Sequence, residues 1–251
     1  MIKRKLAPFL ILLLCAAGIA AVLIRFQDAP AADVVTATSE PAPSGQIPDV
    51  LTIHDQNGNP INLDTGDIPM YKQYLESQED ILTEIRRTQL ETLNLSAQER
   101  YLLLKYNCGN KQCSTILLKN TDSKSTSISL ANGIYQDFKL SPGQDRILLR
   151  YAYNEGDSVV RHILIAVDLP SMKILSYASG ELAKEYMYAP KWPIVSYRWD
   201  NNQQFQIETP DLDSSAFEAL QEWNHSGTQA TKRAEVSLNP NDRLDAYTVP
   251  Q

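Results

Sequence analysis

Two stretches decide the fold that this sequence predicts: Leu102-Leu-Leu-Lys-Tyr106 and, 45 residues later, Ile147-Leu-Leu-Arg-Tyr151. Further matched pairs lie on both sides at the same offset. They are Leu95-Ser96 with Leu140-Ser141, and the loop 109–112 with the loop 154–157. A constant offset across a strand and the turn that follows it indicates one supersecondary unit used twice. Each unit reads as an antiparallel hairpin, because two apolar runs flank a short polar loop.

The second unit carries a resemblance to a known family of repeats. Leu140-Ser-Pro-Gly-Gln-Asp-Arg-Ile-Leu-Leu149, followed by Ile165-Ala-Val-Asp-Leu169, resembles a blade of the WD-type and periplasmic Tol-type β-propellers. The turn of that family reads Ser-Pro-Asp-Gly, and Gly143 stands here where the family has Asp. The resemblance covers roughly residues 95–210 and implies blade-like antiparallel meanders. A third hairpin, around the loop 200–203, departs from the 45-residue period. Three units do not close a ring of at least about four blades, so a sheet or sandwich of meanders is favoured over a complete propeller.

Charge is divided unevenly along the chain. The 23 basic and 30 acidic residues give a net charge of −7, but the segment before Gln27 carries +4 and the remainder −11. So acidic a body repels nucleic acid and anionic bilayer surfaces, which excludes nucleic acid as a partner.

Residues 6–24 form an uncharged apolar stretch between the basic segment 1–5 and Arg25. As a helix they would be about 28 Å long, close to the roughly 30 Å hydrocarbon core of a bilayer. We expect a single transmembrane anchor with residues 1–5 as its cytoplasmic tail, because basic flanks stay inside. The protein would then lie in a bacterial-type cytoplasmic membrane with its C-terminal domain in the periplasm. The alternative is a cleaved signal peptide and a secreted protein.

Cys108 and Cys113 flank the four-residue loop of the first hairpin. Cysteines that face each other across such a loop are within disulfide reach, and we expect them to be bonded in an oxidising compartment. The alternative is a metal or redox pair. A metal site needs about four ligands and redox sites use the C-x-x-C spacing, whereas no further ligand lies nearby in the sequence here.

Beyond the anchor we expect four parts. They are a flexible linker at 25–47, a β-hairpin plus an amphipathic helix at 48–93, a β-rich extracytoplasmic domain with a short C-terminal helix at 94–224, and a polar tail at 225–251. Apolar residues at three- and four-residue steps predict one long helix over 67–93. This helix packs on the β body or serves as a docking helix for a partner. The predicted fold class is mainly β (α+β), with antiparallel blade-like meanders and one long amphipathic helix behind a single transmembrane helix.

The sequence predicts no catalytic residue, no metal site and no cofactor. Its three histidines, His54, His162 and His225, fall in separate predicted elements. No nucleophile elbow, phosphate-binding loop or paired-histidine motif is present in the sequence. We therefore interpret each histidine as structural.

Aromatic residues give the one indication of a binding surface. They cluster in a proline-bearing stretch, and the candidates are Tyr186, Tyr188, Trp192, Tyr197 and Trp199. If exposed, such side chains suit a protein or glycan partner in the envelope; if buried, they fill the core. The function predicted is non-catalytic binding or scaffolding, with assembly into an oligomer through open sheet edges as a further possibility. The alternative is an extracytoplasmic hydrolase that uses carboxylates such as Asp200 or Asp211.

Overall fold

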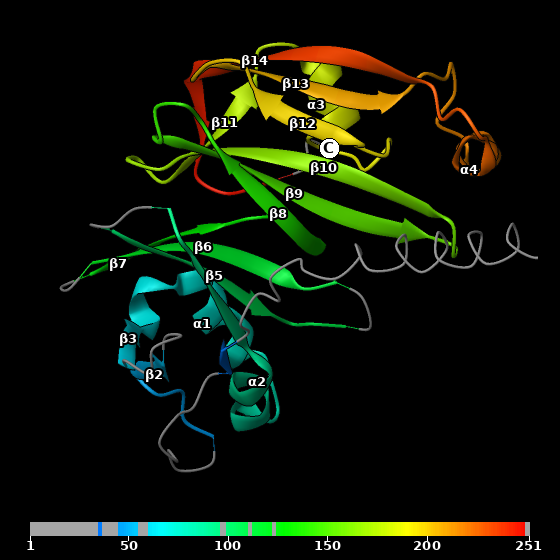
Figure 1. Ribbon diagram of the computed structural model, residues 1–251. Coiled ribbons are helices and arrows are strands. Elements are labelled where there is room, and N and C mark those ends of the chain that lie inside the picture. The colour runs from blue at the N-terminus through cyan, green and yellow to red at the C-terminus, as the bar shows by residue number, and fades with distance from the viewer. Residues whose placement is uncertain are drawn as a thin grey trace, which may run out of the picture. The chain divides into compact units, whose positions relative to one another are not determined.

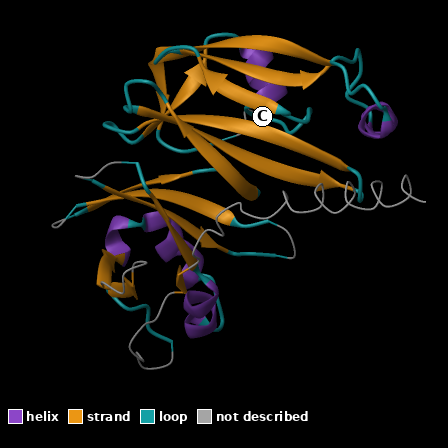
Figure 2. Ribbon diagram, in the orientation of Figure 1, coloured by secondary structure: helices purple, strands orange, loops and turns teal. Residues whose placement is uncertain are grey.

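A computed structural model describes residues 35–36, 45–54, 60–95, 99–109, 112–121 and 124–248. The predicted cytoplasmic tail and the predicted anchor at 6–24 lie outside the described residues. Within those described ranges, no helix is long and apolar enough to cross a membrane. The unit spanning Val34–Gln251 is mainly β, built from antiparallel sheets with a few short helices (Figures 1 and 2).

The first sheet has five antiparallel strands in the order β1-β4-β5-β6-β7. Their bounds are β1 Val35–Thr36, β4 Gln89–Leu93, β5 Arg100–Tyr106, β6 Ser114–Asn120 and β7 Ser125–Ser129. Strand β5 is buried on both faces, with Leu103 in one hydrophobic core and Leu102 and Leu104 in another. This explains its continuous apolar run, since neither face of the strand meets water. The two residues of β1, which pair with β4, fall inside the segment predicted as a flexible linker.

One core lies between the first sheet and a small layer that precedes it in the sequence. That layer contains the hairpin β2 (Val50–His54) and β3 (Pro60–Asp64), the 3-10 helix η1 (Thr65–Asp67), and the helices α1 (Pro69–Glu76) and α2 (Ile81–Arg87). Strands β2 and β3 form the β-hairpin predicted at the start of the segment 48–93, and residues 55–59 between them are not among those described.

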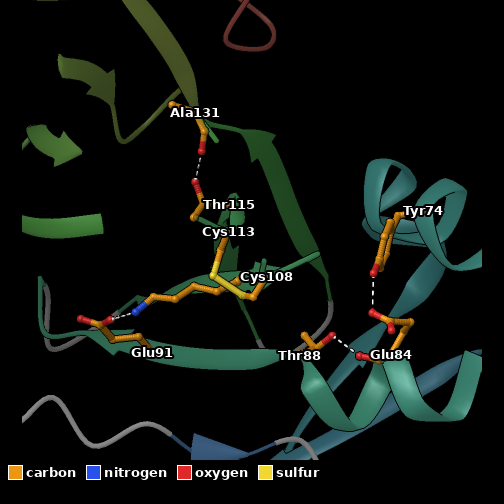
Figure 3. The surroundings of a disulfide bond; sticks show 9 residues. Tyr74, Glu84, Thr88, Glu91, Cys108, Cys113, Thr115 and Ala131 are labelled. Atoms are coloured by element: carbon orange, nitrogen blue, oxygen red, sulfur yellow. Dashed lines mark hydrogen bonds and ion pairs between the residues drawn. A yellow bond between two sulfur atoms is a disulfide. The ribbon is translucent and has the colours of Figure 1, made fainter. Parts of the chain in front are cut away.

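The prediction of one long helix over 67–93 is wrong. Helix α1 ends at Glu76, and α2 starts only at Ile81, where the Asp80 carboxylate accepts a hydrogen bond from the Thr83 backbone N–H at 3.0 Å. Residues 89–93 are strand β4, which pairs with β5. The polar run 77–80 supplies no apolar side chain to bury, and Asp80 starts a new helix as its N-cap. The Tyr74 hydroxyl donates to Glu84 and ties the two short helices together (Figure 3).

The second sheet has seven antiparallel strands in the order β12-β13-β14-β11-β10-β9-β8. Their bounds are β8 Ile134–Leu140, β9 Arg146–Glu155, β10 Val159–Asp168, β11 Lys173–Tyr177, β12 Ser196–Trp199, β13 Gln204–Pro210 and β14 Thr231–Leu244. The sheet curls into a nearly closed, barrel-like form in which the edge strand β12 approaches the opposite edge strand β8. Helix α3 (Gly180–Tyr186) lies against β10 and β11, and helix α4 (Phe217–His225) lies against β10.

The 45-residue repeat corresponds to two successive four-stranded meanders, β4 to β7 and β8 to β11. They pack face to face in the larger core, which contains Leu103 and Leu117 of the first meander with Leu149 and Ile163 of the second. A hydrogen bond of 2.9 Å between the hydroxyls of Thr115 and Tyr151 joins the two buried faces. The hairpin expected around 200–203 is present as β12 and β13.

The prediction of a polar tail at 225–251 is also wrong. Residues 231–244 form β14, the longest described strand, which lies inside the second sheet between β13 and β11 (Figure 1). Only Val236 and Leu238 of this strand are buried, so its composition is polar although it has a neighbouring strand on each side. The register shift between Leu175 and Ser176 of β11 accommodates Pro240, which cannot donate to a strand ladder.

Truncation of β14 side chains tests this correction. We expect Val236→Ala to lower the free energy of unfolding by about 2 kcal/mol, because it removes buried methyl groups and leaves a cavity. The adjacent Glu235→Ala is the matched control, since Glu235 is exposed, and its effect should stay within about 0.5 kcal/mol. Urea denaturation of both variants measures the difference. Equal effects would mean that residues 231–244 do not bury this face.

Candidate functional site

The structure buries most of the aromatic surface that the sequence predicts. Tyr186, Trp192 and Tyr197 are 5%, 8% and 2% exposed, so they fill the core and cannot stack on a partner. The indole N–H of Trp199 donates to the Lys139 carbonyl at 2.9 Å, and its ring packs edge-on against Phe205. Of the five candidates, Tyr188 alone is among the described residues that line the pocket considered next.

That pocket has a volume of about 450 Å³, within the range of sites that hold small ligands. It lies between the two meanders, and segments far apart in the sequence contribute to it. The residues that line it are Met70, Tyr106, Ser114, Thr115, Ser129, Leu130, Asn132, Tyr153, Tyr188, Pro190 and Tyr247. Among these described residues, four are tyrosines and none is charged.

The pocket tyrosines come from four places, and hydrogen bonds to the backbone hold two of them. The Tyr153 hydroxyl, at the end of β9, donates to the Asn132 carbonyl at 2.6 Å. Tyr247 follows β14; its N–H donates to the Ser129 carbonyl at 3.0 Å and its hydroxyl to the Met187 carbonyl at 2.7 Å. Tyr106 and Tyr188 come from the end of β5 and the loop after α3. The rings of Tyr153 and Tyr247 are therefore fixed before any ligand arrives.

Tyr153 is closely packed, and burial affects the ionisation of three of the pocket tyrosines. A Cβ atom at Gly133 would lie 3.0 Å from the ring of Tyr153, which is closer than an ordinary van der Waals contact. Burial raises the pKa of Tyr153 to about 12, and it also raises the pKa values of Tyr106 and Tyr247. The hydroxyls consequently stay protonated at neutral pH, where they offer hydrogen bonds and no charge.

Three polar side chains of the lining remain available to a ligand. Within the described ranges, the hydroxyls of Ser129 and Tyr188 and the amide of Asn132 make no side-chain hydrogen bond. Ser129 and Tyr188 are half-buried and Asn132 is exposed. Each of these groups can both donate and accept. Together with the tyrosine rings they give the pocket stacking surfaces and neutral hydrogen-bonding groups.

The predicted disulfide lies beside the pocket (Figure 3). The sulfur atoms of Cys108 and Cys113 are 2.12 Å apart, which is bonding distance, and their Cα atoms are 4.1 Å apart. The pocket residue Ser114 follows Cys113 directly, and the backbone N–H and C=O of Cys113 pair with those of Gly133. The bond closes a short loop and contributes about 2 kcal/mol by chain entropy. It anchors the hairpin end that forms one wall of the pocket.

The two histidines whose side chains the structure describes, His162 and His225, belong to different elements. His162 is 9% exposed in β10, and its Nδ1 accepts a hydrogen bond from the Ile194 backbone N–H at 2.9 Å. His225 is exposed at the end of α4, and the side chain of His54 lies outside the described residues. The described part of the chain also holds no group of three or more His, Cys, Asp or Glu side chains arranged to bind a metal.

The carboxylates named for a hydrolase do not come together. Asp200 precedes β13 and Asp211 follows it, so the seven-residue strand separates them. Each lies 4.0 Å from a cation of its own, Arg198 for Asp200 and Lys232 for Asp211. Neither residue lines the pocket.

His162 makes stability depend on pH. Burial, and after it the Arg150 guanidinium, lower the pKa of His162 from 6.5 to about 4. The folded state thus favours the neutral ring, and this contribution is complete above the unfolded pKa and is lost as the pH falls toward 4. We expect the free energy of unfolding to drop by about 2 kcal/mol more between pH 7.5 and pH 5 in the wild type than in His162→Asn, whose oxygen can replace the Nδ1 acceptor.

Urea denaturation at the two pH values measures this difference. The matched control is His225→Asn, which removes an exposed histidine and should keep the full pH dependence of the wild type. The assignment fails if His162→Asn and His225→Asn respond alike.

Comparisons with protein-family models, curated proteins and solved structures found no match to this chain. A functional conclusion must therefore come from the chemistry of the pocket and from the sequence around it.

Proposed function

We propose that this chain is a single-pass envelope protein whose extracytoplasmic domain binds an uncharged ligand, without chemical turnover, in the pocket between the two meanders. The observation that carries the proposal is the lining itself: four tyrosines and three available neutral hydrogen-bonding groups around about 450 Å³. Fixed aromatic rings with a few polar groups are typical of binding sites, because they offer contact area at little cost in ordering.

The location in the envelope is supported by the sequence and by the cysteine pair. The basic segment 1–5 and the apolar stretch 6–24 favour an anchor whose C-terminal side is extracytoplasmic. Cys108 is exposed, and a disulfide that reductants can reach persists only where the surroundings are oxidising. Both lines of support favour the same compartment.

Thiol counting in the native envelope tests the compartment and the anchor together. The chain has three cysteines, including Cys15 inside the apolar stretch. We expect a denatured, unreduced sample to add one maleimide-polyethylene glycol at Cys15, and a reduced sample to add three. A cleaved signal peptide would instead give none before reduction and two afterwards. Three additions without reduction would contradict the extracytoplasmic assignment, and Cys108→Ser, which frees Cys113, calibrates the gel shift.

Site-specific photocrosslinking tests the binding function. A benzoylphenylalanine residue replaces Met70, an exposed residue of the pocket lining, and the control position is Asn241, which is exposed and does not line the pocket. We expect an adduct in intact cells from position 70, none from position 241, and loss of the adduct when Tyr188→Ala is added. Equal adducts at both positions, or none at position 70, would refute the pocket as the binding site.

A further inference from the structure

We propose that the ligand of this pocket is an uncharged saccharide, the size of one or two sugar rings at the end of a glycan. This inference rests on the proposed binding function and names its ligand class. Three observations support it. The lining offers tyrosine rings and neutral hydrogen-bonding groups, and its described residues carry no charge. Backbone groups of the neighbouring edge strand are already hydrogen-bonded.

The rings of the pocket suit the apolar faces of a sugar. Tyr153, Tyr188 and Tyr247 are each half-buried, so part of each side chain remains open to a ligand. The C–H face of a pyranose is flat and weakly apolar, and it packs on an aromatic ring while the hydroxyls at its rim stay free for hydrogen bonds. Hydrogen bonds to backbone carbonyls hold Tyr153 and Tyr247 in position, so little side-chain entropy is lost on binding.

The polar groups of the pocket suit the rim of a sugar. A sugar hydroxyl donates one hydrogen bond and accepts others, and the side chains of Ser129, Asn132 and Tyr188 do the same. Phosphate, sulfate and carboxylate ligands are instead bound through Arg or Lys side chains or through helix N-termini. The described lining residues include no Arg or Lys, which favours a ligand without charge.

The sheet edge next to the pocket argues against an extended peptide. A peptide commonly binds by adding a strand to an open edge, where its backbone finds free N–H and C=O groups. The edge strand β7 already uses such groups: the Ser129 carbonyl accepts from Tyr247, and the Ser125 N–H donates to Asp67 at 2.8 Å. The Ser127 hydroxyl also donates to the Asp67 carbonyl at 2.8 Å. A peptide backbone therefore finds both ends of this edge already bonded.

Saturation-transfer NMR on the full chain tests the ligand class. The protein is kept in an amine-oxide detergent, because maltoside and glucoside detergents carry the headgroup under test. The neutral probes are maltose, cellobiose and N,N′-diacetylchitobiose. The competing probes are glucuronic acid, as an acidic sugar, and a tripeptide of alanine with both ends blocked.

We expect at least one neutral disaccharide to bind, with the strongest saturation on its ring C–H protons. Tyr188→Ala and Asn132→Ala should each weaken its affinity at least tenfold, and Tyr188→Phe should weaken it less than Tyr188→Ala because the ring remains. The matched control Asn241→Ala should bind like the wild type. Circular dichroism of each variant establishes that the fold is retained.

The outcomes separate this inference from the proposed function. Absence of binding by all three disaccharides, or binding that both pocket variants retain, overturns the saccharide assignment. Binding of the tripeptide or the acidic sugar in place of the neutral sugars overturns it as well, while an adduct at position 70 would leave the binding function standing. Only failure of the crosslinking experiment refutes the binding function itself.

Discussion

Burial of the first sheet on both faces is the constraint on which the rest of the structure depends. Strand β5 places Leu103 in one core and Leu102 and Leu104 in the other, all three fully buried. A strand with two apolar faces is stable only when both are covered, because each exposed side chain would forgo about 1.5–3 kcal/mol of burial. One cover is the layer of β2, β3, α1 and α2, and the other is the second meander (Figure 2). The pocket forms beside this second cover, where the two meanders meet.

The two edge strands of the second sheet, β12 and β8, approach each other without backbone pairing. Side chains bridge the gap instead. The Asp137 carboxylate of β8 accepts hydrogen bonds from Tyr197 of β12, at 2.6 Å, and from Arg150 of β9. The Lys139 ammonium donates to the Tyr197 carbonyl at 2.6 Å. Unpaired strand edges attract other chains, so this polar seam both closes the sheet and protects it from edge-to-edge pairing. It also explains why Tyr197 is part of the core and not of a binding surface.

Features that depend on neighbouring residues in the sequence could be predicted correctly. The two hairpins of the repeat, the hairpin at 200–203 and the pairing of Cys108 with Cys113 follow from apolar runs, turn residues and spacing. Elements whose structure depends on tertiary contacts could not be predicted from the sequence. Strand β14 has only two buried residues among polar ones, so its composition resembles a tail, and Asp80 divides a helical pattern that looked continuous. Of the pocket residues, the sequence predicts only Tyr188 as part of a binding surface, because tyrosine density does not distinguish core filling from a surface, and Tyr247 lies in the predicted polar tail. The alternation of Val236 and Leu238 is the signal that could have identified β14, the strand that Tyr247 follows.

The position of β14 between β13 and β11 has a consequence for the order in which the chain can fold during synthesis. Strands β11 and β13 are synthesised earlier than β14, and their facing edges have no partner until residues 231–244 pair between them. Contacts between segments so distant in the sequence form slowly, and open edges are prone to wrong pairing in the meantime. The first meander, by contrast, pairs strands that follow one another in the sequence and can form while the remainder is still being synthesised. Completion of the pocket therefore depends on the end of the chain, because Tyr247 follows the last strand.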